Sequence, residues 1–368
     1  MSDQLTGAEQ VGELEVVHTF TGAMPTGVTV SRQGRIFVNF PKWGDDVEAT
    51  VAELRDGTCR PYPDQAWNSP SGDDDAGAFV SVQNVVVDPA DRLWVLDTGS
   101  PLLQPVRTGG AKLVRIDLDT DTVAQTIVFP PDVALPTSYV NDVRFDLRLG
   151  PAGTAFVTDS SMNGPNGIIV VDLATGECWR RLHDDPSTKA EPLTAFRPIV
   201  EGRPLLQRPP DGPASPVTFG ADGIALSVDG SRLFYCPLIS RRLYSVAVRA
   251  LVDRTMDNEQ VAATVREEGD KGSGSDGLES DDAGRLYLTA YEQNAILRRD
   301  PDGGFETLVH DPRLLWPDTM YVAADGYLYV NANQLHRQPT YCGGVDRRRK
   351  PYVLFRVRID AGPVALLP

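Results

Sequence analysis

The sequence predicts an all-β fold, a six-bladed β-propeller built from one repeated unit. Three observations support this prediction. An apolar strand motif recurs six times, a second strand motif lies upstream of each copy at a near-constant offset, and a turn rich in Gly, Asp or Pro separates the two. Such turns are typical of tight hairpins. A sheet unit that cannot bury both of its faces alone is expected to pack radially against further copies.

The upstream motif of each pair is predicted to form the inner strand of a blade. In chain order its copies are PTGVTVS (25–31), VQNVVVD (82–88), VNDVRFD (140–146), GADGIALS (220–227), GSDGLESD (274–281) and WPDTMYVA (316–323). The downstream motif is predicted to form the next strand, and its copies are GRIFVNF (34–40), DRLWVLD (91–97), GTAFVTD (153–159), SRLFYCP (231–237), GRLYLTA (284–290) and GYLYVNA (326–332). In DRLWVLD, Leu93, Val95 and Asp97 share one face and alternate with residues of the other face, and the run is too short for a helix.

The two ends of the chain are predicted to close the ring within one sheet. LEVVHTF (14–20) precedes the first inner strand and YVLFRVRI (352–359) follows the last pair, so their pairing would remove an exposed sheet edge. We therefore expect residues 1–368 to form a single propeller domain. The longest Pro- and Gly-rich insertion, 184–218, is expected to be a loop or lid over one face of the propeller.

Composition and charge narrow the classes of partner. The chain has 368 residues, of which 41% are hydrophobic, and can therefore bury a sizeable core. Its net charge of −16 argues against nucleic acid and anionic membranes as partners, because both require a positive field. The one basic block, RRRK (347–350), is expected to be an exposed turn before the closing strand.

The sequence also favours a cytoplasmic protein without a zinc site. No stretch approaches the roughly 18 apolar residues of a membrane helix, and the start, MSDQLTGAEQ, lacks the charged and apolar regions of a secretory signal. The four cysteines are widely separated and show no zinc-ligand spacing, so we expect buried free thiols: Cys59, Cys178, Cys236 and Cys342.

The chemistry is expected where the inner strands begin, because these strands line the propeller axis and their first residues converge on one mouth. Aligning the upstream motifs predicts a ring of six polar residues: Thr26, Asn84, Asn141, Asp222, Asp276 and Asp318. Each residue alone could cap a strand entry through a local hydrogen bond. Three carboxylates at equivalent points are costly, however, unless a cation or a shared proton offsets their repulsion.

Two chemical interpretations of this ring remain open. Carboxylate and amide oxygens from Asn141, Asp222 and Asp276 would form a hard-donor set for Ca²⁺ or another divalent cation. Without a metal, a carboxyl group of Asp222, Asp276 or Asp318 would have a raised pKa and could act as a general acid or base. The motifs of organic cofactor sites, such as a Gly-rich phosphate loop, are absent from the sequence, so no organic cofactor is expected.

Further side chains near the expected mouth are candidates for binding a small-molecule substrate. Trp316 could stack on a planar compound, Tyr139 or Tyr291 could donate a phenolic proton, and His336 could act as a base. Packing between blades is the structural alternative for the tryptophan. Asn331 and Asn333 share one face of the last hairpin and could reach the funnel, with hydrogen bonding to neighbouring blades as the alternative role.

These motifs carry a family resemblance over most of the chain. GADGIALSVDGSRLFYCPLISRRLYSVAVRAL (220–251), FPKWG (40–44), DRLWVLDTG (91–99), SDGLESDDAGRLYLTAYEQNAI (275–296) and LWPDTMYVAADGYLYVNANQLHR (315–337) resemble landmarks of the yellow and major royal jelly protein family. The resemblance implies a six-bladed propeller. It also implies kinship with insect dopachrome-conversion enzymes, amine-binding salivary proteins and bacterial members of unassigned role.

A more distant resemblance is to the gluconolactonase and senescence-marker propellers. In that group a divalent metal is held by a Glu of the first blade with Asn and Asp of later blades, and NDVRFD (141–146), ADGIALS (221–227) and SDGLESD (275–281) are similar to the later elements. The first blade departs from this pattern, because Thr26 stands where the Glu is expected.

Three functions are therefore compatible with the sequence. The first is an enzyme that catalyses a proton-transfer rearrangement of an unsaturated or aromatic metabolite, as an isomerase, tautomerase or cyclase does. The second is a metal-dependent hydrolase of the lactonase type. The third is a non-catalytic binder of an aromatic or amine ligand. Fold alone does not separate them, and the expected lid favours an enzyme.

Overall fold

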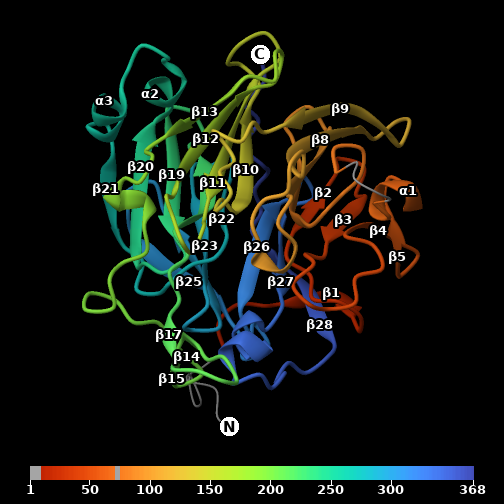
Figure 1. The fold of residues 1–368 in the computed structure, drawn as a ribbon, viewed down its shortest axis with the longest axis vertical. Coiled ribbons are helices and arrows are strands. Elements are labelled where there is room, and N and C mark those ends of the chain that lie inside the picture. The colour runs from red at the N-terminus through yellow and green to blue at the C-terminus, as the bar shows by residue number, and fades with distance from the viewer. Residues whose placement is uncertain (1–9, 71–74) are drawn as a thin grey trace.

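A computed structural model describes residues 10–70 and 75–368, and it is a six-bladed β-propeller (Figure 1). In the described part of the chain, six four-stranded antiparallel sheets form the blades. Residues 1–9, which bear on the expected cytoplasmic location, lie outside the described residues. No helix in the described ranges has the length and apolar character needed to cross a membrane.

The first three blades follow one another along the chain, each with its strands in sequence order from the axis outward. Blade 1 comprises β2 (Val28–Val30), β3 (Ile36–Asn39), β4 (Val51–Arg55) and β5 (Thr58–Pro61). Blade 2 comprises β6 (Val82–Val87), β7 (Leu93–Thr98), β8 (Ala111–Asp117) and β9 (Thr122–Val128). Blade 3 comprises β10 (Val140–Asp146), β11 (Thr154–Asp159), β12 (Gly167–Asp172) and β13 (Cys178–Arg181).

The last three blades repeat the pattern, and the sixth completes the ring. Blade 4 comprises β18 (Ala221–Leu226), β19 (Arg232–Pro237), β20 (Arg242–Ala247) and β21 (Arg266–Asp270). Blade 5 comprises β22 (Leu278–Ser280), β23 (Leu286–Ala290), β24 (Ala295–Arg299) and β25 (Phe305–His310). Blade 6 comprises β26 (Pro317–Val322), β27 (Tyr327–Ala332), β28 (Tyr352–Arg358) and β1 (Glu15–Phe20).

The ring closes as the sequence predicts. The sheet order β1-β28-β27-β26 places the N-terminal strand outside the C-terminal one, in antiparallel register from Glu15↔Arg356 to Phe20↔Tyr352. Each inner strand contacts the inner strands of the two adjacent blades, including β2 with β26. The inner edges of all six sheets therefore face one central axis.

Aromatic residues at one recurring position help to hold the blades together. Each downstream motif carries an aromatic residue at its fourth position: Phe37, Trp94, Phe156, Phe234, Tyr287 and Tyr329. All of them except the half-buried Phe234 are buried. Because each of these rings lies on the second strand of its blade, their burial accounts for the recurrence of the motif without any functional role.

The insertion between β13 and β18 contains two small hairpins rather than a single loop. They are formed by β14 (Ile199–Val200) with β15 (Arg203–Pro204) and by β16 (Leu206–Gln207) with β17 (Ser215–Pro216). In Figure 1 they lie at the lower end of the molecule, beside the loop that leads into β28. The described helices are short and peripheral: α1 (Gln65–Asn68), α2 (Val248–Val252) and α3 (Asn258–Ala262).

Candidate functional site

A cavity of about 210 Å³ lies on the propeller axis, at the end where the inner strands begin. Part of its polar lining comes from the starts of five inner strands: Gln83, Asn141, Asp222, Asp276 and Asp318. Its apolar walls come from loops around the mouth: Leu102, Leu103, Met162, Phe219, Leu238 and Leu335. An apolar protein cavity of about 150 Å³ can hold benzene, so this cavity, the axial funnel, has room for one substituted ring.

A shift in strand register turns the polar residues toward the funnel. The pairing of β10 with β11 passes from Val140↔Asp159 directly to Val143↔Val157, so two residues of the inner strand occupy the space opposite one. The same irregularity occurs at the starts of β6, β18 and β26. Such bulges bend a strand and re-aim a side chain, which here is the first residue of the irregular segment.

The structure corrects the ring at its second member. Val82 pairs with Asp97 in the same way as Val140 pairs with Asp159, so Gln83 rather than Asn84 takes the position expected to line the funnel. Asn84 is buried and its amide group donates to Asp142 of the adjacent blade. The motifs themselves align Gln83 of VQNVVVD with Asn141 of VNDVRFD, so Asn84 was chosen one position too late.

Asp222 and Asp276 form an acid pair inside the funnel. Burial and the negative charges of Asp276 and Asp318 raise the pKa of Asp222 well above its usual range. Burial also raises the pKa of Asp276, to about 6, while hydrogen bonds from Trp316 and Asp222 limit the rise. Both carboxyl groups therefore hold a proton more tightly than an ordinary aspartic acid does, because burial and the surrounding negative charge penalise their ionised forms.

Asp318 completes the acidic side of the funnel. Its carboxylate accepts hydrogen bonds from Asn333 Nδ2 at 2.5 Å and from Thr319 Oγ1 at 3.1 Å. Burial and the nearby charge of Asp276 raise its pKa well above the usual value despite these donors. Asn333 thus acts as a support for Asp318, and its Nδ2 also donates to Pro25 O at 3.0 Å, so it does not reach the cavity itself.

Trp316 and Tyr291, which were expected at the mouth as substrate-binding residues, do not line the funnel, because both residues are 0% exposed. Their rings stack with centroids 4.4 Å apart and planes 7° from parallel. Trp316 Nε1 donates to Asp276 Oδ2 at 2.7 Å, and Tyr291 Oη donates to the Leu238 carbonyl at 2.7 Å. Trp316 holds a left-handed backbone conformation with φ of 60°, which is strained for a bulky residue and directs its indole beneath the acid pair.

His336, Asn331 and Thr26 also lie outside the funnel lining. Asn331 Nδ2 donates to the carbonyls of Thr26 and Gly27, which is the blade-to-blade role given above as its alternative. Thr26 Oγ1 donates to Gln83 O at 3.0 Å and is 0% exposed. His336 lies behind Trp316, with Nε2 2.8 Å from Glu201 Oε2, and burial lowers its pKa so that the imidazole is neutral.

Tyr139 does line the funnel, and it lies within a network that the motifs did not reveal. Its hydroxyl donates to Gln83 Oε1 at 2.9 Å and accepts from Trp43 Nε1 at 2.8 Å. Burial and the charges of Asp222 and Asp318 raise its pKa well above 10, so it remains a phenol. Trp43 lies in the FPKWG segment, whose match to the family was the only sequence signal that pointed to it.

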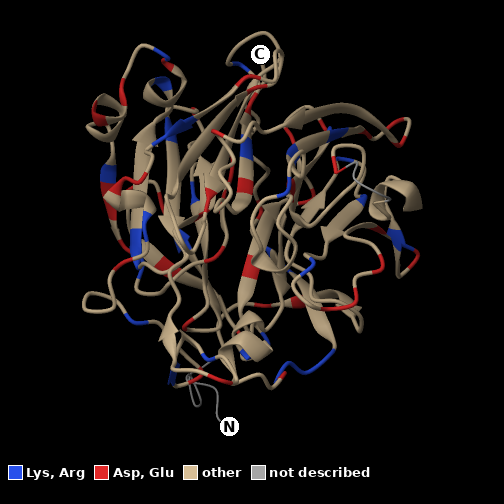
Figure 2. Ribbon diagram, in the orientation of Figure 1, with Lys and Arg blue, Asp and Glu red and all other residues tan. Residues whose placement is uncertain are grey.

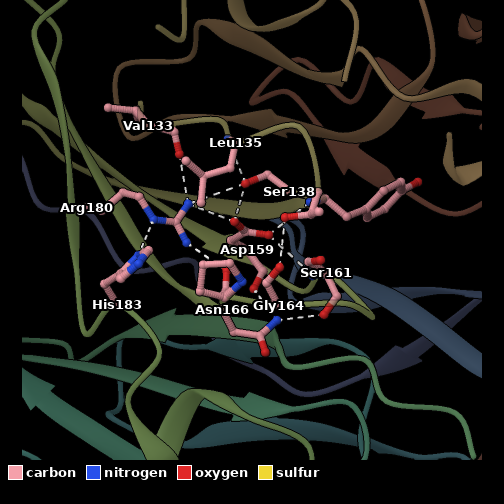
Figure 3. Close-up of polar contacts among 12 residues, drawn as sticks. Val133, Leu135, Ser138, Asp159, Ser161, Gly164, Asn166, Arg180 and His183 are labelled. Carbon is pink, nitrogen blue, oxygen red and sulfur yellow. Dashed lines mark hydrogen bonds and ion pairs between the residues drawn. The ribbon is translucent and has the colours of Figure 1, made fainter. Parts of the chain in front are cut away.

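A buried ion pair fixes the backbone of Tyr139. Asp159, at the end of β11, accepts from Tyr139 N at 2.9 Å and from Ser138 Oγ at 2.5 Å, and Arg180 Nη1 lies 2.8 Å from its Oδ2. Figure 3 shows Asp159 enclosed between Ser138 and Arg180, with His183 on the far side of the guanidinium group. Asp159, the final residue of the downstream motif, therefore fixes the backbone at the mouth of the funnel through hydrogen bonds.

The funnel matches a divalent cation in donor chemistry but not in arrangement. Carboxyl and amide oxygens suit Ca²⁺, yet among the described residues no three His, Cys, Asp or Glu side chains are grouped to hold a metal ion. Asp276 and Asp318 direct oxygens to Trp316 and Asn333, and Thr26 at the first blade is engaged with Gln83. The expected set of Asn141, Asp222 and Asp276 is thus brought to one cavity without forming a ligand cage.

Comparison with known proteins identifies related sequences. The family model for major royal jelly protein matches residues 80–359. The yellow proteins of Drosophila subobscura and Drosophila melanogaster are each 26% identical to the chain over 288 residues. These alignments cover 75% and 74% of the chain but 48% and 50% of the relatives, so the chain spans about half the length of the curated relatives it matches.

Comparison with solved structures shows the same fold at low sequence identity. A calcium-binding protein, regucalcin, from Agrobacterium tumefaciens superimposes with a TM-score of 0.57 and 13% identity, covering 95% of each chain. A gluconolactonase from Xanthomonas campestris superimposes with a TM-score of 0.54 and 14% identity, covering 97% of this chain and 93% of that one. At such identities the likeness extends to the fold alone.

Proposed function

Because this chain belongs to the major royal jelly protein family, we propose that its axial funnel is the active site of an enzyme that rearranges a small unsaturated or aromatic molecule by proton transfer. The observation that carries the proposal is the Asp222–Asp276 pair, in which burial raises the pKa of both neighbouring carboxyl groups and the charges of Asp276 and Asp318 raise that of Asp222 further. Pairs of this kind supply an acid and a base at the same pH.

In this proposal each member of the pair has its own role. Asp276, ionised above pH of about 6, removes a proton from an acidic C–H or O–H group of the substrate. Asp222, still protonated, delivers its proton to another atom of the substrate. The hydrogen bond between the two carboxyl groups then returns the proton from Asp276 to Asp222, so the enzyme ends the cycle in its starting state.

The remaining funnel groups suit the binding of an enolisable aromatic compound. The amides of Gln83 and Asn141 provide neutral donors for a developing oxyanion, and the Tyr139 phenol, which donates to Gln83 Oε1, orients the Gln83 amide. Apolar walls and a volume of about 210 Å³ favour a single planar ring over a long or polymeric substrate. The low exposure of Asp222 and Asp276, 4% and 8%, limits competition from water.

A lactonase-type hydrolase is the second candidate, favoured by the oxygen donors of the funnel and by the gluconolactonase-like fold. A cation held there would polarise a lactone carbonyl and activate water. The described side chains would have to rearrange to hold it, so no step is assigned to a metal.

A substrate panel separates the candidates. Lactones and enolisable aromatics are incubated with the protein in D2O, with and without EDTA. The proposal predicts that at least one enolisable compound gains solvent deuterium at a rate that EDTA does not change. Lactone opening that EDTA abolishes, with no deuterium in any enolisable compound, would support the hydrolase, and binding without turnover would support a ligand carrier.

A further inference from the structure

A second, larger cavity of about 830 Å³ lies beside the funnel, between the insertion and the loop before β28. It is unusually basic, because six arginines line it: Arg203, Arg208, Arg337, Arg347, Arg348 and Arg349. Only two carboxylates, Glu201 and Asp346, share the lining. We call this cavity the arginine groove. Figure 2 shows the run 347–350 as a blue segment that leads into β28.

The ion pairs of the groove leave part of this charge uncompensated. Glu201 is engaged by Arg337 and by His336, and Asp346 is engaged by Arg348, whose guanidinium also lies 2.7 Å from Asp45 Oδ1. Even with Arg203 left out of the balance, five guanidinium groups face three carboxylates, those of Glu201, Asp346 and Asp45, so the groove keeps a net positive charge.

Arg208 is held in place by uncharged acceptors. Its Nη1 and Nη2 each donate to Pro204 O at 3.2 Å, so the guanidinium is ordered by a group that does not neutralise it. Arg347 and Arg349 are exposed, and their side chains form no ion pair with the described residues. An ordered guanidinium group beside exposed ones is a recurrent arrangement for binding phosphate or carboxylate.

We propose that the arginine groove binds a small molecule that carries two or more acidic groups, phosphate or carboxylate. Guanidinium groups recognise both kinds of oxyanion through paired N–H donors. The volume of about 830 Å³ is within the range of small-molecule sites. A nucleic acid or an acidic polymer would extend beyond the groove over a protein with a net charge of −16, so a compact anion fits better.

The groove and the funnel share one wall. Tyr341 lines both cavities, and the consecutive residues Gln207 and Arg208 line the funnel and the groove respectively. Glu201 in the groove contacts His336, whose ring stacks on Trp316 with centroids 5.8 Å apart. An anion that draws Arg337 away from Glu201 therefore alters the packing around a buried tryptophan, which provides an optical signal of binding.

The test uses isothermal titration calorimetry with inorganic pyrophosphate and citrate as separate probes of phosphate and carboxylate binding. The variant is Arg347→Ala with Arg349→Ala, two exposed positions where substitution should leave the fold intact. The control is Arg60→Ala with Arg358→Ala, which removes the same charge from positions 55% and 69% exposed that do not line the groove.

We expect saturable binding of at least one probe to the wild-type protein, with a change in tryptophan fluorescence. Loss of the two arginines should raise its Kd at least tenfold, while the control should remain within about twofold of wild type. Absence of saturable binding of both probes to wild-type protein would overturn the proposal. An equal loss of affinity in the control variant would also overturn it, because the effect would then be one of net charge. This test measures binding alone, so its result is independent of the reaction proposed for the funnel.

Discussion

Replacing Asp276 with Asn should remove a pH-dependent loss of folding stability that arises when the buried carboxyl group ionises. The pKa of Asp276 is raised from 3.8 to about 6 because burial penalises the carboxylate. A carboxyl group with a raised folded-state pKa stabilises the protein only while it is protonated, so this contribution is complete below pH of about 4 and is lost as the pH rises through 6. Asn keeps an acceptor for Trp316 Nε1 and cannot ionise.

The magnitude follows from the pKa displacement. At about 1.4 kcal/mol per pKa unit, a rise from 3.8 to about 6 corresponds to about 3 kcal/mol of lost stability at high pH. Roughly half of this, about 1 to 2 kcal/mol, develops between pH 5 and pH 8. Relative to wild type, the Asn variant should therefore become more stable by about 1 to 2 kcal/mol over this interval.

The assay is urea unfolding of wild type and variant at pH 5, 6, 7 and 8, followed by circular dichroism. Asp132→Asn removes an exposed carboxylate and controls for the change in net charge. The reasoning would be refuted if the difference in unfolding free energy between wild type and Asp276→Asn stayed constant from pH 5 to pH 8, or if Asp132→Asn gave the same trend.

Three further substitutions test the supports of the site. Asp159→Ala should lower the free energy of unfolding by about 3–5 kcal/mol, because it leaves Arg180 buried without its counter-ion, and urea unfolding measures this loss. Gly27→Ala should lower the free energy of unfolding by about 1–3 kcal/mol, because the added Cβ would lie 2.1 Å from Asn39 Oδ1. An unchanged midpoint of urea unfolding would show that Asn39 does not pack this tightly against the Gly27 backbone. Tyr139→Phe should slow deuterium exchange into the substrate by roughly 100-fold, because the Gln83 amide that binds the oxyanion loses the phenol that orients it, and an unaltered rate would remove Tyr139 from the mechanism.

The repeat of the fold was predictable because each blade must satisfy the same packing problem. Turn residues, alternating apolar residues and the recurring aromatic residue are each required by hairpin formation or by burial within and between blades. Because every blade has these requirements, the pattern repeats in the sequence. The closing pair β1 and β28 followed from the need to remove a sheet edge, and it was predicted correctly.

The site was predictable only at the level of strand starts. Asn141, Asp222, Asp276 and Asp318 do converge on one cavity, as the ring hypothesis expected. Asn84 was misplaced by one residue, although the aligned motifs already match Gln83 to Asn141 and the two blades have equivalent bulges.

Whether a side chain lines the cavity or is buried behind it also depends on tertiary packing, which the position of a residue in a motif does not determine. Trp316 lies two residues before the lining residue Asp318 and Tyr291 directly follows the motif GRLYLTA, yet both side chains are buried and stack against each other outside the cavity. Gln83 and Trp43 line the funnel and both form hydrogen bonds with the Tyr139 hydroxyl. The three residues come from different parts of the chain, so no local pattern links them. The arginine groove combines two loops about 140 residues apart, so no local pattern could reveal it.

The central claim, that Asp276 and Asp222 move protons in the axial funnel, is tested most directly by the pH dependence of solvent deuterium incorporation into an enolisable aromatic substrate. The rate for wild type should rise with pH through about 6, where Asp276 ionises, and EDTA should leave it unchanged. Asp276→Asn and Asp222→Asn should each abolish the incorporation while remaining folded. Incorporation at the wild-type rate by either variant, or a rate independent of pH between 5 and 8, would contradict the account.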